Sequence, residues 1–176
     1  MLIRESQKVS AIPCISSSVA NCIQSLVLLN VLPKSIADRI PFVEYEPLYT
    51  PEGFAATAIT GEQIIARMSE GPVWLAVRDE EIVGTVSVVA KAESLYLRGM
   101  AVLPLARWRG IGAFLLTHVE EFARTEGFSR LFLSTTPFLD RAIRLYQRFG
   151  FLPTLEGPHE LFGTPLFTME KSSKAE

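Results

Sequence analysis

The chain has 176 residues, a formal net charge of −2, 48% hydrophobic residues and 20% charged residues. This length and composition are typical of one folded domain with a buried core, and they exclude a disordered chain. The balanced charge gives no reason to expect nucleic acid as a partner, and the two cysteines, eight residues apart and without a second pair, lack the pattern of a zinc site. We therefore expect neither a nucleic-acid partner nor a metal.

The N-terminal part contains a long uncharged stretch, residues 9–33. Polar residues interrupt it, so it is a poor membrane span, and no small-residue cleavage site follows it. Apolar residues at helical spacing after Ser16–Ser18 instead predict a helix that Pro33 ends. With Cys14 and Cys22 interpreted as reduced thiols, we expect a cytoplasmic protein that binds no membrane.

The middle of the chain predicts a short helix and a β-hairpin. Thr60–Gln63 has the spacing of a capping box, and Gly71-Pro72 would end the helix that follows. Two apolar runs, 73–77 and 82–90, flank a polar turn and predict an antiparallel pair, with a third strand at 95–102. The inward positions of the short helix are Ile64, Ile65 and Met68.

Helices and strands alternate in the C-terminal half. Helical periodicity predicts a helix over 111–126, with Gly127 at its C′ position, and a second helix that opens near Asp140 and ends at Gly150. Between them, the apolar run 130–134 is typical of a strand covered on both faces. The final strands are expected at 151–152 and 164–170.

The predicted order is a strand, helices, three strands, a helix, a strand, a helix and two strands. That order predicts a mixed α/β sheet with helices on both faces.

Residues 107–112, RWRGIG, join the strand at 95–102 to the helix at 111–126. The first amides of a helix and its dipole favour an anion, and glycine removes the Cβ atoms that would block a phosphate. Arg107 and Arg109 add positive charge. The lysine of a Walker loop and the third glycine of a dinucleotide fingerprint are absent, so both motifs are disfavoured. A tight turn with solvated arginines remains the alternative.

Two blocks carry a resemblance to a known family. The segment MAVLPLARWRGIG (100–112) resembles the acetyl-CoA signature of the GNAT superfamily of N-acetyltransferases, through Arg107, Gly110 and Gly112 and the preceding valine-x-proline. The second block, AIRLYQRFGF (142–151), resembles the family's closing helix, which ends in a tyrosine-containing stretch and Gly-Phe.

The resemblance is good over 72–151 and implies a single GNAT-like domain over 1–176. The first sixty residues of the chain are expected to form an atypical helical part that borders the acceptor site. The implied fold is α/β (α+β), with a mixed, mostly antiparallel sheet whose fourth and fifth strands, 95–102 and 130–134, splay apart.

The resemblance also implies acetyl-CoA as co-substrate. Its pyrophosphate is expected on the turn, and its pantetheine arm between the splayed strands, where a backbone amide would stabilise the oxyanion. The asparagine that often opens the closing helix is replaced by Leu139, so that contact is missing or is supplied by Thr135. The expected cofactor-binding residues are Met100, Ala101, Val102, Arg107, Trp108, Arg109, Gly110, Ile111, Gly112, Ala113, Thr135 and Leu139.

Tyr146 matches the family tyrosine that protonates the leaving thiolate, although it also fits the apolar stripe of its helix. The strand glutamate that serves as general base in some relatives corresponds to Tyr96 here, so the identity of the general base is left open. We interpret His118 as structural, and His159 fits a surface loop as well as a base. The carboxylates considered near the acceptor cleft are Glu44, Glu46, Glu93 and Glu160.

Strand alternation places Tyr96, Arg98 and Met100 on one face, with Tyr96 and Arg98 as acceptor-binding candidates. Arg98 is expected either to pair with a cleft glutamate or to bind a carboxylate of the acceptor. The resemblance implies that the aromatic and acidic segment 41–54 walls the acceptor site, although its aromatic residues suit a packed loop equally well.

The expected function is transfer of acetyl from acetyl-CoA to a primary amine of a small molecule in a ternary complex. The alternatives are a longer acyl group and a non-catalytic acyl-CoA-binding module. The family commonly forms homodimers, and this chain could do so.

Overall fold

The computed structural model describes residues 10–14, 43–58, 63, 67–79, 81–157 and 159–173. The helix expected after Ser16–Ser18 lies outside these residues. So does most of the helix expected after Thr60, of which Gln63, Arg67 and Met68 are described and helical.

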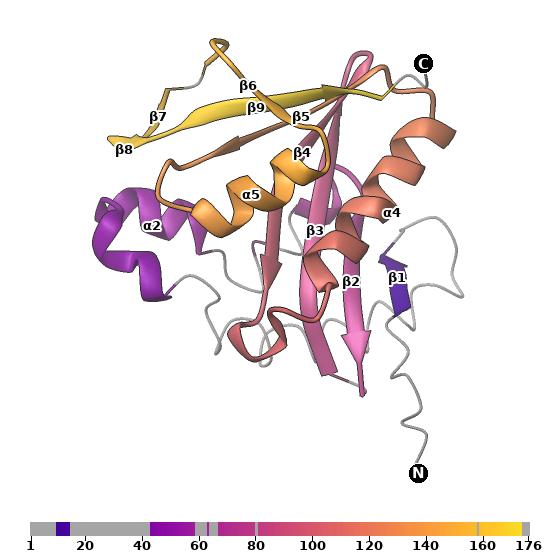
Figure 1. Cartoon of the computed structure of the whole chain (residues 1–176), viewed down its shortest axis with the longest axis horizontal. Helices are drawn as coiled ribbons and strands as arrows, with labels where there is room; N and C mark the ends of the chain where they lie inside the picture. The colour runs from indigo at the N-terminus through magenta and orange to yellow at the C-terminus, as the bar shows by residue number, and fades with distance from the viewer. Residues whose placement is uncertain are drawn as a thin grey trace.

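A seven-stranded sheet forms the centre of the molecule, with the spatial order β1-β2-β3-β4-β5-β9-β6 (Figure 1). Neighbouring strands are antiparallel except β4 and β5, which are parallel. The mixed, mostly antiparallel sheet is therefore confirmed. Its strands are β1 (Ser10–Cys14), β2 (Val73–Arg78), β3 (Glu81–Lys91), β4 (Ser94–Val102), β5 (Arg130–Thr135), β6 (Leu152–Thr154) and β9 (Phe167–Ser172). A separate pair is formed by β7 (Glu160–Leu161) and β8 (Thr164–Pro165).

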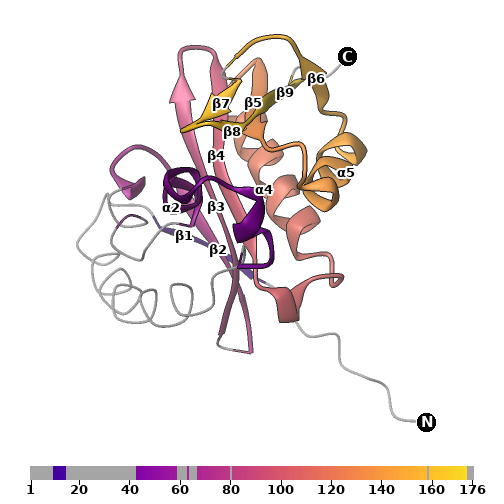
Figure 2. The same cartoon turned by 90° about the vertical axis from the view of Figure 1, so that its left-hand side faces the viewer.

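Helices lie on both sides of the sheet. The helices α4 (Ile111–Thr125) and α5 (Asp140–Arg148) cover one face, and α2 (Pro51–Thr57) lies toward the other (Figure 2). The 3-10 turns η1 (Val43–Leu48) and η2 (Pro104–Ala106) precede α2 and α4. In the part of the chain that the structure describes, no helix is long and apolar enough to cross a membrane.

The main core lies between the sheet and α4. The helix buries a stripe at the expected spacing, and Gly127 follows it with a φ of +77°. His118 belongs to this packing, because its ring lies 5.2 Å from that of Trp74. The buried residues of α4 are Ile111, Leu115, Leu116, Val119 and Ala123.

The two parallel strands meet over only part of their length. Ser94, Leu95 and Tyr96 of β4 pair with Arg130, Leu131 and Phe132 of β5, and no further pairs follow. The rest of β4 and β5 diverges, which confirms the predicted splay. We call the three paired positions the joint; the rings of Tyr96 and Phe132 pack across it in a tilted arrangement, with centroids 4.9 Å apart.

A β-bulge bends β4 just beyond the joint. Leu97 pairs with Val88 and Gly99 pairs with Ser87, so Arg98 is an extra residue in β4. The bulge reverses the alternation of side chains after Arg98: Leu97 and Met100 both pack on the α4 core. The prediction that Met100 shares a face with Tyr96 and Arg98 is therefore wrong, because the pattern assumed a regular strand.

Candidate active site

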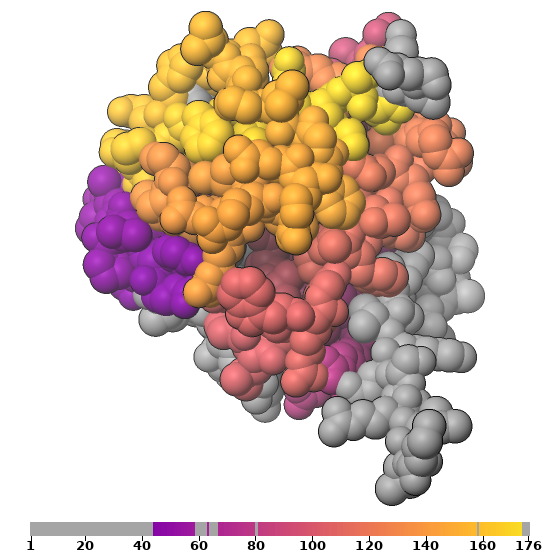
Figure 3. Space-filling view, viewed as in Figure 1, coloured from indigo at the N-terminus to yellow at the C-terminus, as the bar shows by residue number. Residues whose placement is uncertain are grey.

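The splay opens into a cavity of about 960 Å³. The cavity runs from the turn before α4, past α5, to the side of the sheet that carries η1 and α2. Figure 3 shows the surface hollowed between α5 and the turn. All the predicted site residues except Arg109 line this cavity. The structure thus brings together two sequence blocks that are separated by a helix and a strand.

The turn before α4 presents backbone amides to the cavity. The first intrahelical bond runs from the Phe114 amide to the Gly110 carbonyl at 2.9 Å. The amides of Ile111, Gly112 and Ala113 therefore start the helix without an intrahelical acceptor, and all three residues line the cavity. Together with the helix dipole, these amides suit a phosphate group.

Glycine is needed at the two positions of RWRGIG for different structural reasons. Gly110 has a φ of +77°, and a Cβ there would meet nothing within 4 Å, so glycine is needed for its backbone conformation. Gly112 has no such φ, but its Cβ would lie 2.9 Å from Leu145 Cδ2. Gly112 therefore allows α5 to approach the first turn of α4.

Two side chains of the turn, Arg107 and Trp108, are each paired with a residue from elsewhere in the chain. Arg107 forms an ion pair with Glu44, so this charge is already matched within the chain. Trp108 is 84% exposed and has a φ of +66°, unusual for a bulky residue. Arg141 of α5 places its Cζ 5.1 Å from the centre of the indole. The Trp108 indole thus joins the turn to α5.

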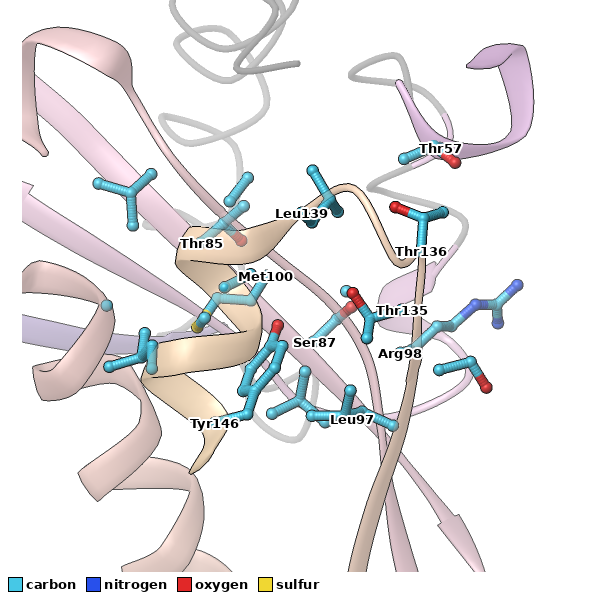
Figure 4. A pocket seen from close by; sticks show the side chains of 18 of the residues that line it. Thr57, Thr85, Ser87, Leu97, Arg98, Met100, Thr135, Thr136, Leu139 and Tyr146 are labelled. Carbon is cyan, nitrogen blue, oxygen red and sulfur yellow. The ribbon is translucent and has the colours of Figure 1, made fainter. Parts of the chain in front are cut away.

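Tyr146 is the buried residue of α5 and lines the cavity. Figure 4 shows its ring projecting from α5 into the cavity, close to Met100 of β4. Burial is the main cause that raises the pKa of Tyr146, and the charge of Tyr96 adds to it. The phenol therefore remains protonated through the neutral and mildly alkaline range, as a proton donor must. Its ring also packs on Phe151, with centroids 5.9 Å apart, so its structural and donor roles are compatible.

The far side of the cavity holds the acceptor-binding candidates. Arg98 forms an ion pair with Glu70, the pairing with a glutamate that was one of its two expected roles. In Figure 4 its guanidinium points away from Tyr146. Tyr45 and Tyr49 of the predicted aromatic wall line the cavity, and the Tyr49 ring lies 4.8 Å from that of Phe138.

The remaining base candidates lie in different surroundings. Glu44 is held by Arg107, while Glu46, Glu93 and His159 are exposed. Among the described residues, the carboxylates that line the cavity are Glu70 and Glu160.

The sequence reasoning missed Arg67 and Glu70, which both line the cavity. Arg67 lies three residues after Ile64, on the inward stripe of the predicted helix, and that position was the available signal.

Comparisons with known proteins agree with this architecture. A model of the acetyltransferase (GNAT) family matches residues 37–151. The uncharacterized N-acetyltransferase YjgM of Escherichia coli (strain K12) is 34% identical over 82 residues, which are 44% of this chain and 49% of that protein. The streptothricin acetyltransferase of Streptomyces lavendulae is 38% identical over 66 residues, 38% of this chain and 35% of that protein. The chain thus spans half or less of the curated relatives it matches.

Solved structures match over nearly the whole chain. The PaiA N-acetyltransferase from Thermoplasma acidophilum, in complex with coenzyme A, has a TM-score of 0.67 at 18% identity, covering 94% of this chain and 99% of that one. A GNAT family acetyltransferase from Elizabethkingia anophelis with acetyl-CoA bound has a TM-score of 0.60 at 18% identity, covering 93% and 97%. Since the family model matches well over half of the sequence and the fold agrees, this chain belongs to the GNAT family of acetyltransferases.

Proposed function

We propose that this protein is an N-acetyltransferase that moves the acetyl group of acetyl-CoA to a primary amine of a small molecule. The observation that carries the proposal is the combination of a splay between β4 and β5, a row of helix-start amides at one end and Tyr146 inside. Family members of the same fold have been solved with coenzyme A or acetyl-CoA bound, which supports this choice of co-substrate.

The residues present fit acetyl-CoA. The amides of Ile111 to Ala113 would hold the pyrophosphate, with Arg109 and Arg141 nearby as positive charges. The diverging backbones of β4 and β5 leave hydrogen-bonding groups free of each other along the cavity. These groups suit the amide-containing arm of the co-substrate. When bound, acetyl-CoA supplies an activated acyl group as a thioester.

The chain's own groups would then do the chemistry in the ternary complex. Backbone amides near Met100 to Val102 stabilise the negative charge that develops on the carbonyl oxygen as the amine nitrogen attacks the carbonyl carbon. The carbon–sulfur bond breaks, and the Tyr146 phenol donates its proton to the departing sulfur. Since Arg98 engages Glu70, Glu160 and cavity water are left to accept the proton that the amine releases.

One experiment tests the proposal at two levels. The full chain is mixed with acetyl-CoA and a panel of primary amines, and free thiol is followed over time. We expect acetyl-CoA to bind and at least one amine to be turned over. Binding without turnover across a broad panel would favour a non-catalytic module, and absence of acetyl-CoA binding by calorimetry would refute the proposal. Repeating the assay with longer acyl-CoA esters shows whether acetyl is the preferred group.

A further inference from the structure

A second arginine, Arg67, lies in the cavity beside the Arg98–Glu70 pair and has no carboxylate partner among the described residues. The Arg67 side chain is partly buried and lines the cavity, and across the described ranges it forms no ion pair. Burial is the main cause that lowers the pKa of Arg67, and the charge of Arg98 lowers it further. Two guanidinium groups therefore share this part of the cavity with one carboxylate, Glu70.

The β4 bulge creates the place where Arg67 lies. It puts both Arg98 and Gly99 on the acceptor side of the sheet. A Cβ atom on Gly99 would lie 3.3 Å from Arg67 Nη1 and 3.8 Å from Ser87 Oγ. The guanidinium thus rests against bare backbone, with the hydroxyl of Ser87 close to the same spot.

A guanidinium that is partly removed from water and lies near a second guanidinium is unfavourable unless an anion pairs with it. Arginine presents a planar fork of donors that matches a carboxylate better than a lysine would. Arg67, Tyr96 and Tyr146 all line this cavity. An anion held by Arg67 therefore occupies the same cavity as the proton donor of the reaction.

We propose that the acceptor is an amine that also carries a carboxylate, and that Arg67 binds this carboxylate. The inference rests on the proposed function, because the amine of that molecule is the group to be acetylated. Arg98 is already held by Glu70, so Arg67 carries the unmatched positive charge, and Gly99 leaves room for its guanidinium.

The test compares pairs of amines that differ only in the carboxylate. The pairs are leucine with isopentylamine, phenylalanine with phenethylamine, and γ-aminobutyrate with propylamine. Their affinities for the full chain are measured by calorimetry in the presence of coenzyme A, so the readout needs no turnover. We expect at least one carboxylated member to bind roughly tenfold to a hundredfold more tightly than its partner.

The Arg67→Met variant should lose this preference while its affinity for coenzyme A stays unchanged. Gly99→Ala, whose Cβ would lie 3.3 Å from Arg67 Nη1 and shift it slightly, should weaken the preference to a smaller extent. Arg124→Met, an exposed position on α4 outside the cavity, is the matched control and should keep it. If Arg67→Met does not fold, the comparison of each amine pair in the wild type decides whether the acceptor carries a carboxylate, and Gly99→Ala tests the place of Arg67.

Two results would overturn the inference: equal binding of every pair by the wild type, or an undiminished preference in the variants. A failure to turn over any amine would affect the proposed function alone, because the carboxylate preference is measured at equilibrium.

Discussion

Tyr146 and Gly110 each serve a different purpose in this cavity. Tyr146 combines a buried ring with a pKa that burial raises, and Gly110 adopts a left-handed backbone that orients the amide row. The sequence motif identified both residues, because each task depends on a local residue type. It did not identify Arg67, whose importance depends on what surrounds it after folding.

The Tyr146→Phe variant should lower kcat by roughly a hundredfold or more, because the departing sulfur loses its proton donor. The Michaelis constant for acetyl-CoA should change little, since the phenyl ring still packs on Phe151. Steady-state kinetics with free-thiol detection measures both. An unchanged kcat would mean that the tyrosine is only part of the core.

The raised pKa of Tyr146 also predicts alkaline instability. Below pH 10 the phenol is protonated in the folded and the unfolded chain, so stability is unaffected. As the pH rises through the ordinary value of 10.0, the unfolded tyrosine loses its proton and the buried one keeps it. The free energy of unfolding should then fall by up to about 1.4 kcal/mol per pH unit for this group.

Urea titrations at several pH values between neutral and strongly alkaline check this slope. Tyr146→Phe should show a shallower decline than the wild type. Tyr49→Phe is a useful comparison, because burial raises the pKa of Tyr49 in the same direction. Parallel curves for Tyr146→Phe and the wild type would contradict the prediction.

At the scale of elements, the position of α4 on the sheet decides where its amides point. Gly84 of β3 lies beneath the first turn: a Cβ there would be 3.1 Å from Ile111 Cγ2 and 3.3 Å from Leu115 Cδ1. The Gly84→Val variant should therefore lift this end of α4 and destabilise the protein by about 1–3 kcal/mol.

Acetyl-CoA binding should weaken in Gly84→Val even though position 84 does not line the cavity. Calorimetry and urea unfolding measure the two effects. The variant Val88→Ile, in the same strand and core, controls for general overpacking and should leave the affinity unchanged.

Periodicity predicted most elements well, because strand pairs and helix stripes follow from local patterns. The strands 73–77, 82–90 and 95–102 and both C-terminal helices occur within a few residues of the predicted bounds. The bulge at Arg98 could not be predicted, since it is defined by pairing with Ser87 and Val88 on another strand. That single extra residue exchanged the faces of Gly99 and Met100, so that Gly99 lies on the acceptor side and Met100 on the core side.

At the scale of the whole molecule, the sheet consists of two half-sheets. One contains β1 to β4 with α4, and the other contains β5, β9 and β6 with α5. The amide turn belongs to the first half and Tyr146 to the second. Bound coenzyme A would contact both, so saturating ligand should stabilise the chain by about 2.7 kcal/mol at a hundred times the dissociation constant.

From this arrangement we expect the joint to act as a hinge whose stiffness sets the width of the cavity. Arg130 lies at the joint, outside the cavity lining, with its Cζ 5.0 Å above the Phe132 ring that packs against Tyr96. Glu156 and Glu170 hold its guanidinium.

The variant Arg130→Met should loosen the hinge and reduce coenzyme A affinity severalfold without touching the ligand. High salt should mimic the substitution in the wild type and have less effect in the variant, as measured by calorimetry. Affinity for the acetyl donor would thus be adjustable at the joint, through the angle between the two half-sheets.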